Sequence, residues 1–226
     1  MLTRREALGL SGVLVTAGTA GCLDRIPFIG DDPIEFEASP ASVPADILDA
    51  TGYEETGVEE VVIEETFEAG GQSQDVLVTN WHAEYEKSID LDIGGLASMS
   101  NVQAGVFTAI STPKVEVLNR TFNPVAEMDT DELAEMVQDQ YDGLDNLERI
   151  GEDTATILGQ STTVGEYEGQ AELLEIGETV DLTLHIAQAV ESGDDLILGI
   201  GGYPTDMQDQ ERDDVFTMME AIKHDG

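Results

Sequence analysis

Residues 180–186, which read Val-Asp-Leu-Thr-Leu-His-Ile, carry the clearest structural signal in the chain. Apolar side chains occupy every second position, and polar side chains fill the positions between them. Alternation with a period of two is typical of a β-strand that has one face buried and the other in solvent. The stretch therefore predicts a sheet with one buried face, and it places His185 on the solvated side of that sheet.

Further strand signals lie on both sides of this stretch. From residue 153 to residue 203 the chain is strand-like, with turns expected at Gly165, Gly177 and Gly193. Four earlier strands are expected, two forming a hairpin around Gly70-Gly71 and two flanking Pro113, at residues 58–67, 74–85, 102–111 and 115–122.

Three helices are expected between or after these strands. Pro44 at a first turn after Ser42, with Gly52 beyond, predicts a short helix. Asp129 and Glu132 have the spacing of a capping box and begin a second helix, and Asp209 can cap a third. Apolar residues recur at helical spacing in the last two: Leu133, Met136, Val137 and Tyr141, then Val215, Phe216, Met219 and Ile222.

Runs of strands with few helices favour the α+β class over a regular alternation of strands and helices. We expect an antiparallel β-sheet covered by a few helices. Residues 1–21 are interpreted as a signal peptide, residues 22–43 as a proline-rich tether, and residues 44–226 as a single α+β domain.

The charge of the chain limits its partners and its solvent. The 226 residues include 48 Asp and Glu against 9 Lys and Arg, a formal charge of −39. Such a surface repels phosphates, so nucleic acids are excluded as ligands. The acids are spread along the whole chain, which argues against an acidic tail or a calcium-loaded segment. We expect an extreme halophile as the source, because molar salt shortens the Debye length to about 3 Å and screens neighbouring carboxylates.

The first residues have the order of an export signal. Arg4-Arg5 precedes an apolar run from Ala7 to Gly21, which is too short for a membrane-spanning helix of about 20 residues. The twin arginine resembles a Tat signal, the route for folded proteins. An uncleaved membrane helix is the alternative.

Cys22 is the single cysteine of the chain, so no disulfide framework is possible. Ala20-Gly21-Cys22 resembles a lipobox, which predicts that Cys22 is lipidated and holds the protein on the outer face of the cell membrane.

No catalytic or metal-binding motif stands out. His82, His185 and His224 fall on three different expected elements, without the close spacing of a zinc site, and we expect no metal and no cofactor. His82 beside Trp81 is expected to be half-buried, and His224 is expected to be frayed. Adjacent carboxylates such as Asp194-Asp195 are expected by chance in so acidic a chain.

Two further local patterns carry predictions. Residues 199–202, Gly-Ile-Gly-Gly, are expected to bend a strand. Asn119-Arg120-Thr121 fits the N-glycosylation pattern and makes Asn119 a candidate acceptor.

The chain resembles a haloarchaeal family of exported lipoproteins whose function is uncharacterised. The resemblance rests on short motifs in a fixed order: Arg4-Arg5, Ala20-Gly21-Cys22, Ser111-Thr112-Pro113, Asn123-Pro124, Leu158-Gly159-Gln160-Ser161 and Gly202-Tyr203-Pro204. It implies no catalytic residues. The strand-rich part closed by a helix is also similar to PsbP-like domains, α/β/α sandwiches that act as accessory, non-catalytic extracytoplasmic proteins.

Three classes of function follow from these observations. The first is a non-enzymatic lipoprotein that binds an unknown protein partner or small ligand, or serves as an accessory subunit. The second is a lipid or small-molecule carrier, which needs an apolar cavity between sheet and helices. The third is a hydrolase with two carboxyls converging in a cleft.

Overall fold

The computed structural model describes residues 33–69, 72–92, 98–117, 120–121, 123–141, 143–173 and 178–226. Its strands are β1 (Ile34–Glu37), β2 (Glu54–Ala69), β3 (Gln72–Asp92), β4 (Ser98–Pro113), β5 (Glu116–Val117), β6 (Arg120–Thr121), β7 (Leu144–Ile157), β8 (Gln160–Leu173), β9 (Glu178–Ala187), β10 (Val190–Ser192) and β11 (Asp195–Pro204). The helices are α1 (Ala45–Thr51), α2 (Thr130–Gln140) and α3 (Gln208–Ala221), with the short 3-10 helices η1 (Pro124–Ala126) and η2 (Thr205–Met207). Several positions singled out from the sequence lie outside the described residues, among them Arg4, Arg5, Ala20, Gly21, Cys22, Gly70, Gly71, Asn119 and Gly177.

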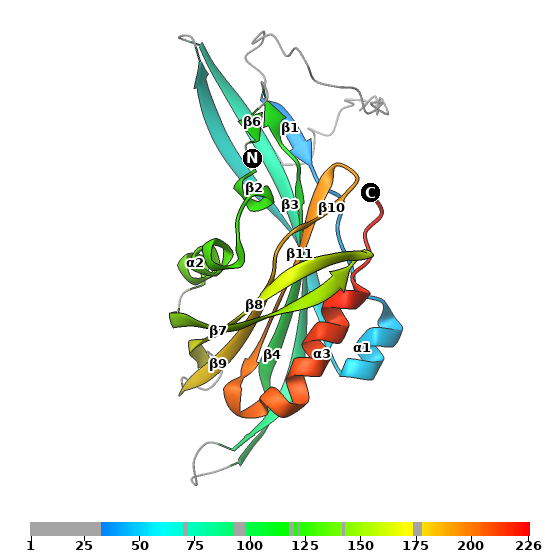
Figure 1. Ribbon diagram of the computed structural model, residues 1–226, viewed down its shortest axis with the longest axis vertical. Coiled ribbons are helices and arrows are strands. Elements are labelled where there is room, and N and C mark those ends of the chain that lie inside the picture. Colours follow the sequence, from blue (N-terminus) through cyan, green and yellow to red (C-terminus); the bar gives the residue numbers. More distant parts are fainter. Residues whose placement is uncertain are drawn as a thin grey trace, which may run out of the picture.

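One large sheet runs through the molecule in the order β1-β3-β4-β11-β9-β8-β7, with β2 paired to β3 and β10 paired to β11 (Figure 1). β1 and β3 are parallel, and the other neighbours in this sheet are antiparallel. β11 joins the two halves of the sheet, because it pairs with β4 on one side and β9 on the other. A mostly antiparallel sheet with a few helices confirms the expected fold class.

Helices pack against both faces of this sheet. On one face Met218 and Met219 of α3 join a core cluster with Phe107 and Tyr203. On the other, Leu133 of α2 belongs to a second cluster that includes Leu182, Leu184 and Ile186 of β9. Figure 1 shows α2 on one side of the sheet and α1 with α3 on the other.

The prediction that β9 has one solvated face is therefore wrong. Thr183 and His185, on the polar side of the alternating stretch, are 0% and 1% exposed. The cause is α3, which contacts β9 on that face although it lies more than twenty residues further along the chain.

Glycines in β11 let α3 lie close to the sheet. A Cβ atom at Gly201 would lie 2.5 Å from Cγ1 of Val215, and one at Gly199 would lie 3.2 Å from Cγ of Met219. The pairing of β11 with β4 shows no register shift from Asp195 to Gly202. Residues 199–202 therefore carry no bulge, the expected bend stays a prediction, and the glycines serve helix packing.

Gly165 lies inside β8 and does not form the expected turn. A Cβ atom there would lie 2.8 Å from Cβ of Thr130, so this glycine lets α2 approach the sheet. The chain reverses instead at Leu158 and Gly159, which join β7 to β8 with φ angles of 50° and 77°. Two successive residues with positive φ are typical of a tight hairpin turn.

The strand expected at residues 115–122 is replaced by β5 and β6. These two short strands pair with each other in a separate two-stranded sheet, so the chain reverses within that range. The hairpin of β2 and β3 and the turn at Gly193 are confirmed, and the paired strands are longer than expected.

Residues 33–43, assigned to the tether from the sequence, are partly built into the fold. β1 pairs with Val76–Thr79 of β3, and Ala38, Ala41 and Val43 are buried. Proline content alone did not reveal this, because β1 lies between Pro33 and Pro40.

The three expected helices are confirmed, with different caps at two of them. α1 follows Pro44 and ends at Gly52 with φ of 80°, whereas the backbone of Ser42 pairs with Lys223. Asp209 lies in the first turn of α3 and does not cap it, because η2 leads directly into this helix.

Candidate functional site

A cavity of about 240 Å³ lies between α2 and the sheet. Its walls come from β2, β3, β4 and β11 with η1 and α2. Buried side chains form its floor and include Val76, Asn80, Thr112 and Leu198. Exposed side chains form its rim and include Ile63, Glu65, Pro124 and Gln140. The lining is mostly apolar with a few polar side chains, as is common for small-molecule sites.

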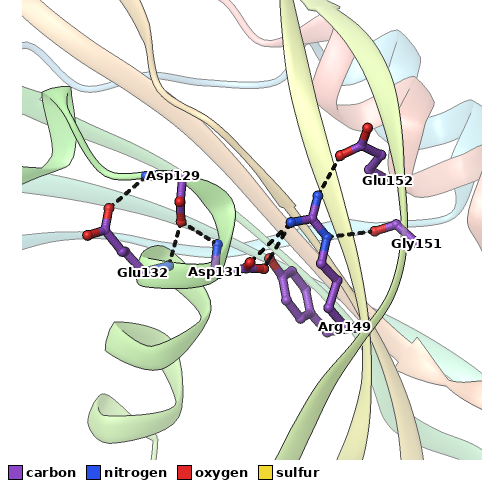
Figure 2. Close-up of polar contacts among 7 residues, drawn as sticks. Asp129, Asp131, Glu132, Arg149, Gly151 and Glu152 are labelled. Atoms are coloured by element: carbon purple, nitrogen blue, oxygen red, sulfur yellow. Dashed lines mark hydrogen bonds and ion pairs between the residues drawn. The ribbon is translucent and has the colours of Figure 1, made fainter.

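Hydrogen bonds and an ion pair at the N-terminus of α2 hold this helix in place, and the helix closes one side of the cavity (Figure 2). The carboxylate of Asp129 accepts hydrogen bonds from the backbone N–H groups of Asp131 and Glu132, and Glu132 accepts one from the backbone of Asp129. Arg149 of β7 binds the Asp131 carboxylate at 3.1 Å, and Tyr167 donates to it at 2.7 Å. The capping box predicted from the sequence is confirmed. The contacts of Asp131 with Arg149 and Tyr167 hold α2 against β7 and β8.

Two polar side chains of β3 line the cavity. Asn80 is 7% exposed, and its Oδ1 atom has no hydrogen-bond partner among the described residues. Burial lowers the pKa of His82 below its ordinary value, and the nearby charge of Glu59 only partly opposes this effect. The imidazole is therefore neutral near pH 7. His82 is half-buried, as expected from the sequence.

Two motifs of the family resemblance meet beside the cavity. The Asn123 side chain donates to Oγ1 of Thr112 at 2.7 Å and to the carbonyl of Pro113 at 2.8 Å. Its own Oδ1 accepts from the backbone of Val125 and caps η1. Asn123-Pro124 therefore acts as the turn that places η1 over β4.

The side chain of His224 is buried and makes several polar contacts, so the expectation of a frayed residue is wrong. Its Nδ1 lies 2.9 Å from Oγ of Ser192, and its Nε2 lies 3.1 Å from Oδ2 of Asp195 and 3.0 Å from the carbonyl of Ser39. Serine, histidine and aspartate also compose the catalytic triads of hydrolases. Here 0% of the His224 side chain is exposed, so a substrate cannot reach this imidazole. The contacts join the segments after β1 and after α3 to β10 and β11.

His185 forms a second buried polar contact, on the sheet face covered by α3. Its Nε2 lies 2.7 Å from the hydroxyl of Tyr203, and its Nδ1 has no partner among the described residues. Burial, aided by the charge of Arg212 and opposed by Asp153, lowers the pKa of His185 to about 4.

The titration of His185 should therefore lower the stability of the fold in acid. The unfolded chain takes up a proton near pH 6.5, whereas the folded one resists it until about pH 4, so the contribution is complete above pH 6.5 and is lost between these values. Its size is about 3 kcal/mol at most, at about 1.4 kcal/mol for each pKa unit. We expect the free energy of unfolding in molar salt to fall by about 2–3 kcal/mol more in the wild type than in a His185→Gln variant between about pH 7 and pH 4.5.

Urea titrations at the two pH values measure this difference. The comparison with the variant removes the effect of the many carboxylates that titrate in the same range. Parallel pH curves for the two proteins would contradict the assignment.

Lys87 of β3 joins two acids of α3. Its Nζ lies 2.9 Å from Oε2 of Glu211 and 2.7 Å from Oδ2 of Asp214, and it lies 5.6 Å from the centre of the Tyr53 ring. Burial opposes its charge, but the hydrogen bonds that Lys87 donates to Asp214 and Glu211 outweigh burial and raise the pKa of Lys87. This contact could not be predicted from the sequence, since Lys87, Glu211 and Asp214 are residue types that commonly lie at the surface.

Neither a metal centre nor a carboxylate pair is found at the cavity. Among its lining residues Glu65 is the one carboxyl, whereas a glycosidase-type site needs two. No group of three or more His, Cys, Asp or Glu side chains in the described ranges is placed to hold a metal ion. Within the same ranges, no helix is both long and apolar enough to span a membrane.

Comparison with known proteins gives a family without an assigned activity. Residues 40–223 match the family described as a domain of unknown function (DUF6517). No curated protein matches the chain. Among solved structures it is similar to the solution structure of cyanobacterial PsbP (CyanoP) from Synechocystis sp. PCC 6803, with 14% identity and a TM-score of 0.37 over 95% of this chain and 100% of that one. The expectation of an uncharacterised family is confirmed, and the chain belongs to the DUF6517 family.

Proposed function

We propose that this protein is a lipid-anchored, extracytoplasmic lipoprotein of a halophile that acts as a non-catalytic binding or accessory subunit. The observation that carries the proposal is the cavity between α2 and the sheet, with apolar walls and a buried, unpartnered Asn80 Oδ1. A cavity in this position is what the carrier alternative required. The helices on both faces of the sheet also favour the PsbP-like α/β/α arrangement suggested by the sequence.

The proposed anchor is Cys22. The lipobox-like residues before it and the short apolar run support lipidation, and the acidic surface offers no attraction to anionic headgroups. Because β1 begins at Ile34, about a dozen residues separate Cys22 from the sheet.

Membrane fractionation tests the anchor. We expect the wild type to sediment with membranes of its host and a Cys22→Ser variant to move to the soluble fraction. Retention of the variant on membranes would contradict lipid anchoring at this residue.

Binding of the neutral fluorescent probe N-phenylnaphthylamine in molar salt tests the cavity. Val78 lines the cavity, and its replacement by Phe should weaken binding by about tenfold or more, since the added ring occupies the site. Val62 is 51% exposed and is not a lining residue, so Val62→Phe is the matched control and should bind as the wild type does.

Two outcomes would count against the cavity as a binding site. One is the absence of probe binding, and the other is equal binding by both variants. In the first case the accessory role alone would remain, and cross-linking of intact cells in molar salt would search for its protein partner.

A further inference from the structure

Asn80 gives the cavity a defined polar contact at depth. It is more than nine-tenths buried, it lies among the lining residues, and its Oδ1 has no partner within the described part of the chain. Buried oxygen acceptors in native proteins are rarely left without a donor. A ligand that brings one N–H or O–H group to this oxygen would satisfy it.

Below the rim, the lining around Asn80 is apolar apart from His82, Thr112 and Asn123, and the last two hydrogen-bond to each other. Val76, Val78, Ile110 and Leu198 line the same cavity. Its volume of about 240 Å³ is smaller than the clefts of about 300–1,000 Å³ that hold drug-sized ligands. A compact apolar group therefore fits the space around the one polar contact.

Charge at the cavity disfavours anions. No Lys or Arg is among its lining residues, and its one carboxylate, Glu65, lies at the exposed rim. His82 is the remaining titratable group of the lining, and its burial favours the neutral imidazole. The whole chain adds a formal charge of −39, which repels anions before they reach the site.

We infer that the cavity binds a neutral, apolar compound that carries a single hydrogen-bond donor, which it gives to Oδ1 of Asn80. The inference rests on the proposed binding function and narrows it to a ligand class. Carboxylates of the same size are excluded as ligands, since their oxygens and Oδ1 of Asn80 are all hydrogen-bond acceptors.

Small aromatic probes of matched size test the ligand class on the full chain, carrying Cys22→Ser, in molar salt. Benzyl alcohol has the donor, benzyl methyl ether has it blocked, ethylbenzene lacks it, and benzoate is an anion. Ligand-observed NMR titration gives the affinity of each. We expect benzyl alcohol to bind about tenfold tighter than its methyl ether, and benzoate not to bind measurably.

Asn80→Leu removes the acceptor while keeping the size of the side chain. We expect the affinity ratio of benzyl alcohol to ethylbenzene to fall by about tenfold in this variant. Gln170 is an exposed polar residue of β8 that does not line the cavity, so Gln170→Leu is the matched control and should leave the ratio unchanged. If Asn80→Leu does not fold, the comparison of alcohol and ether on the otherwise unchanged chain still tests the inference.

The outcomes distinguish a failure of the inference from a failure of the proposed binding function. Equal binding of alcohol and ether, or an unchanged ratio in Asn80→Leu, would overturn the donor requirement while leaving an apolar binding site. Tighter binding of the ether would mean that the amide presents its N–H groups to the cavity, which also overturns the inference. Binding of none of the four probes would overturn the inference and the cavity as a binding site, and only the accessory role would remain.

Discussion

Replacing Lys87 by Met is expected to lower the free energy of unfolding by about 3–5 kcal/mol, which is typical when one partner of a buried ion pair is removed. The Glu211 side chain is 4% exposed, and Met leaves its charge without a partner inside the protein. Asp214, at 30% exposed, also loses its cation. Molar salt should not remove this effect, because buried pairs are screened much less than exposed ones.

Lys114 offers a matched control. It pairs with Glu191 at 2.8 Å, but 72% of the Glu191 side chain is exposed. Lys114→Met should therefore cost about 0–1 kcal/mol, as exposed pairs do. Thermal or urea unfolding of both variants in molar salt measures the contrast.

Neutralising the two carboxylates that have lost their partner should restore stability. In the Lys87→Met background, Glu211→Gln and Asp214→Asn together should recover a large part of the loss, because the buried groups are then neutral. Equal losses in Lys87→Met and Lys114→Met, or no recovery in the triple variant, would contradict the assigned role of Lys87.

The second large effect is the loss of the native fold when salt is removed. The mature chain, residues 22–226, should give a native circular-dichroism spectrum in molar salt and lose it at about 0.1 M, where the Debye length is about 10 Å. The structure places many carboxylates at exposed positions of one edge strand, among them Glu59, Glu60, Glu64 and Glu65 of β2. At low salt these charges repel one another across distances that molar salt screens.

Two controls separate charge screening from a general effect of excluded solutes. Sucrose strengthens burial without ions and should not replace the salt. Changing the four β2 glutamates to Gln should lower the salt concentration at the unfolding midpoint. A native spectrum in low salt, or full rescue by sucrose, would contradict screening as the cause.

Local signals predicted the parts of the fold that local chemistry controls. The capping box at Asp129 and Glu132 and the left-handed end of α1 at Gly52 depend on a few neighbouring residues, and both were predictable. The turn at Leu158 and Gly159 was not predicted, because leucine rarely adopts a positive φ. Leu158 packs against a core cluster there, and this contact stabilises an unfavourable backbone.

Features made by distant segments could not be predicted in the same way. His185 is buried because α3 folds back over β9, and no pattern within residues 180–186 contains that information. The cavity has the same origin, since Asn80, Thr112 and Leu198 come from three separate strands. Its motifs on the two sides, Ser111-Thr112-Pro113 and Asn123-Pro124, were visible in the sequence, but their contact was not.

The place of β11 in the sheet has a consequence for synthesis and export. β1 to β4 lie on one side of β11 and β7 to β9 on the other, and β11 is the strand that pairs with both groups. While the chain is being made, each group can form its own hairpins, but the two cannot become one sheet until residues 195–204 have left the ribosome. The core face that receives α3 is incomplete until then, so compaction is a late event after translation. A secretion route that translocates an extended, unfolded chain would interrupt this folding step. A route that translocates folded proteins would let folding be completed in the cytoplasm.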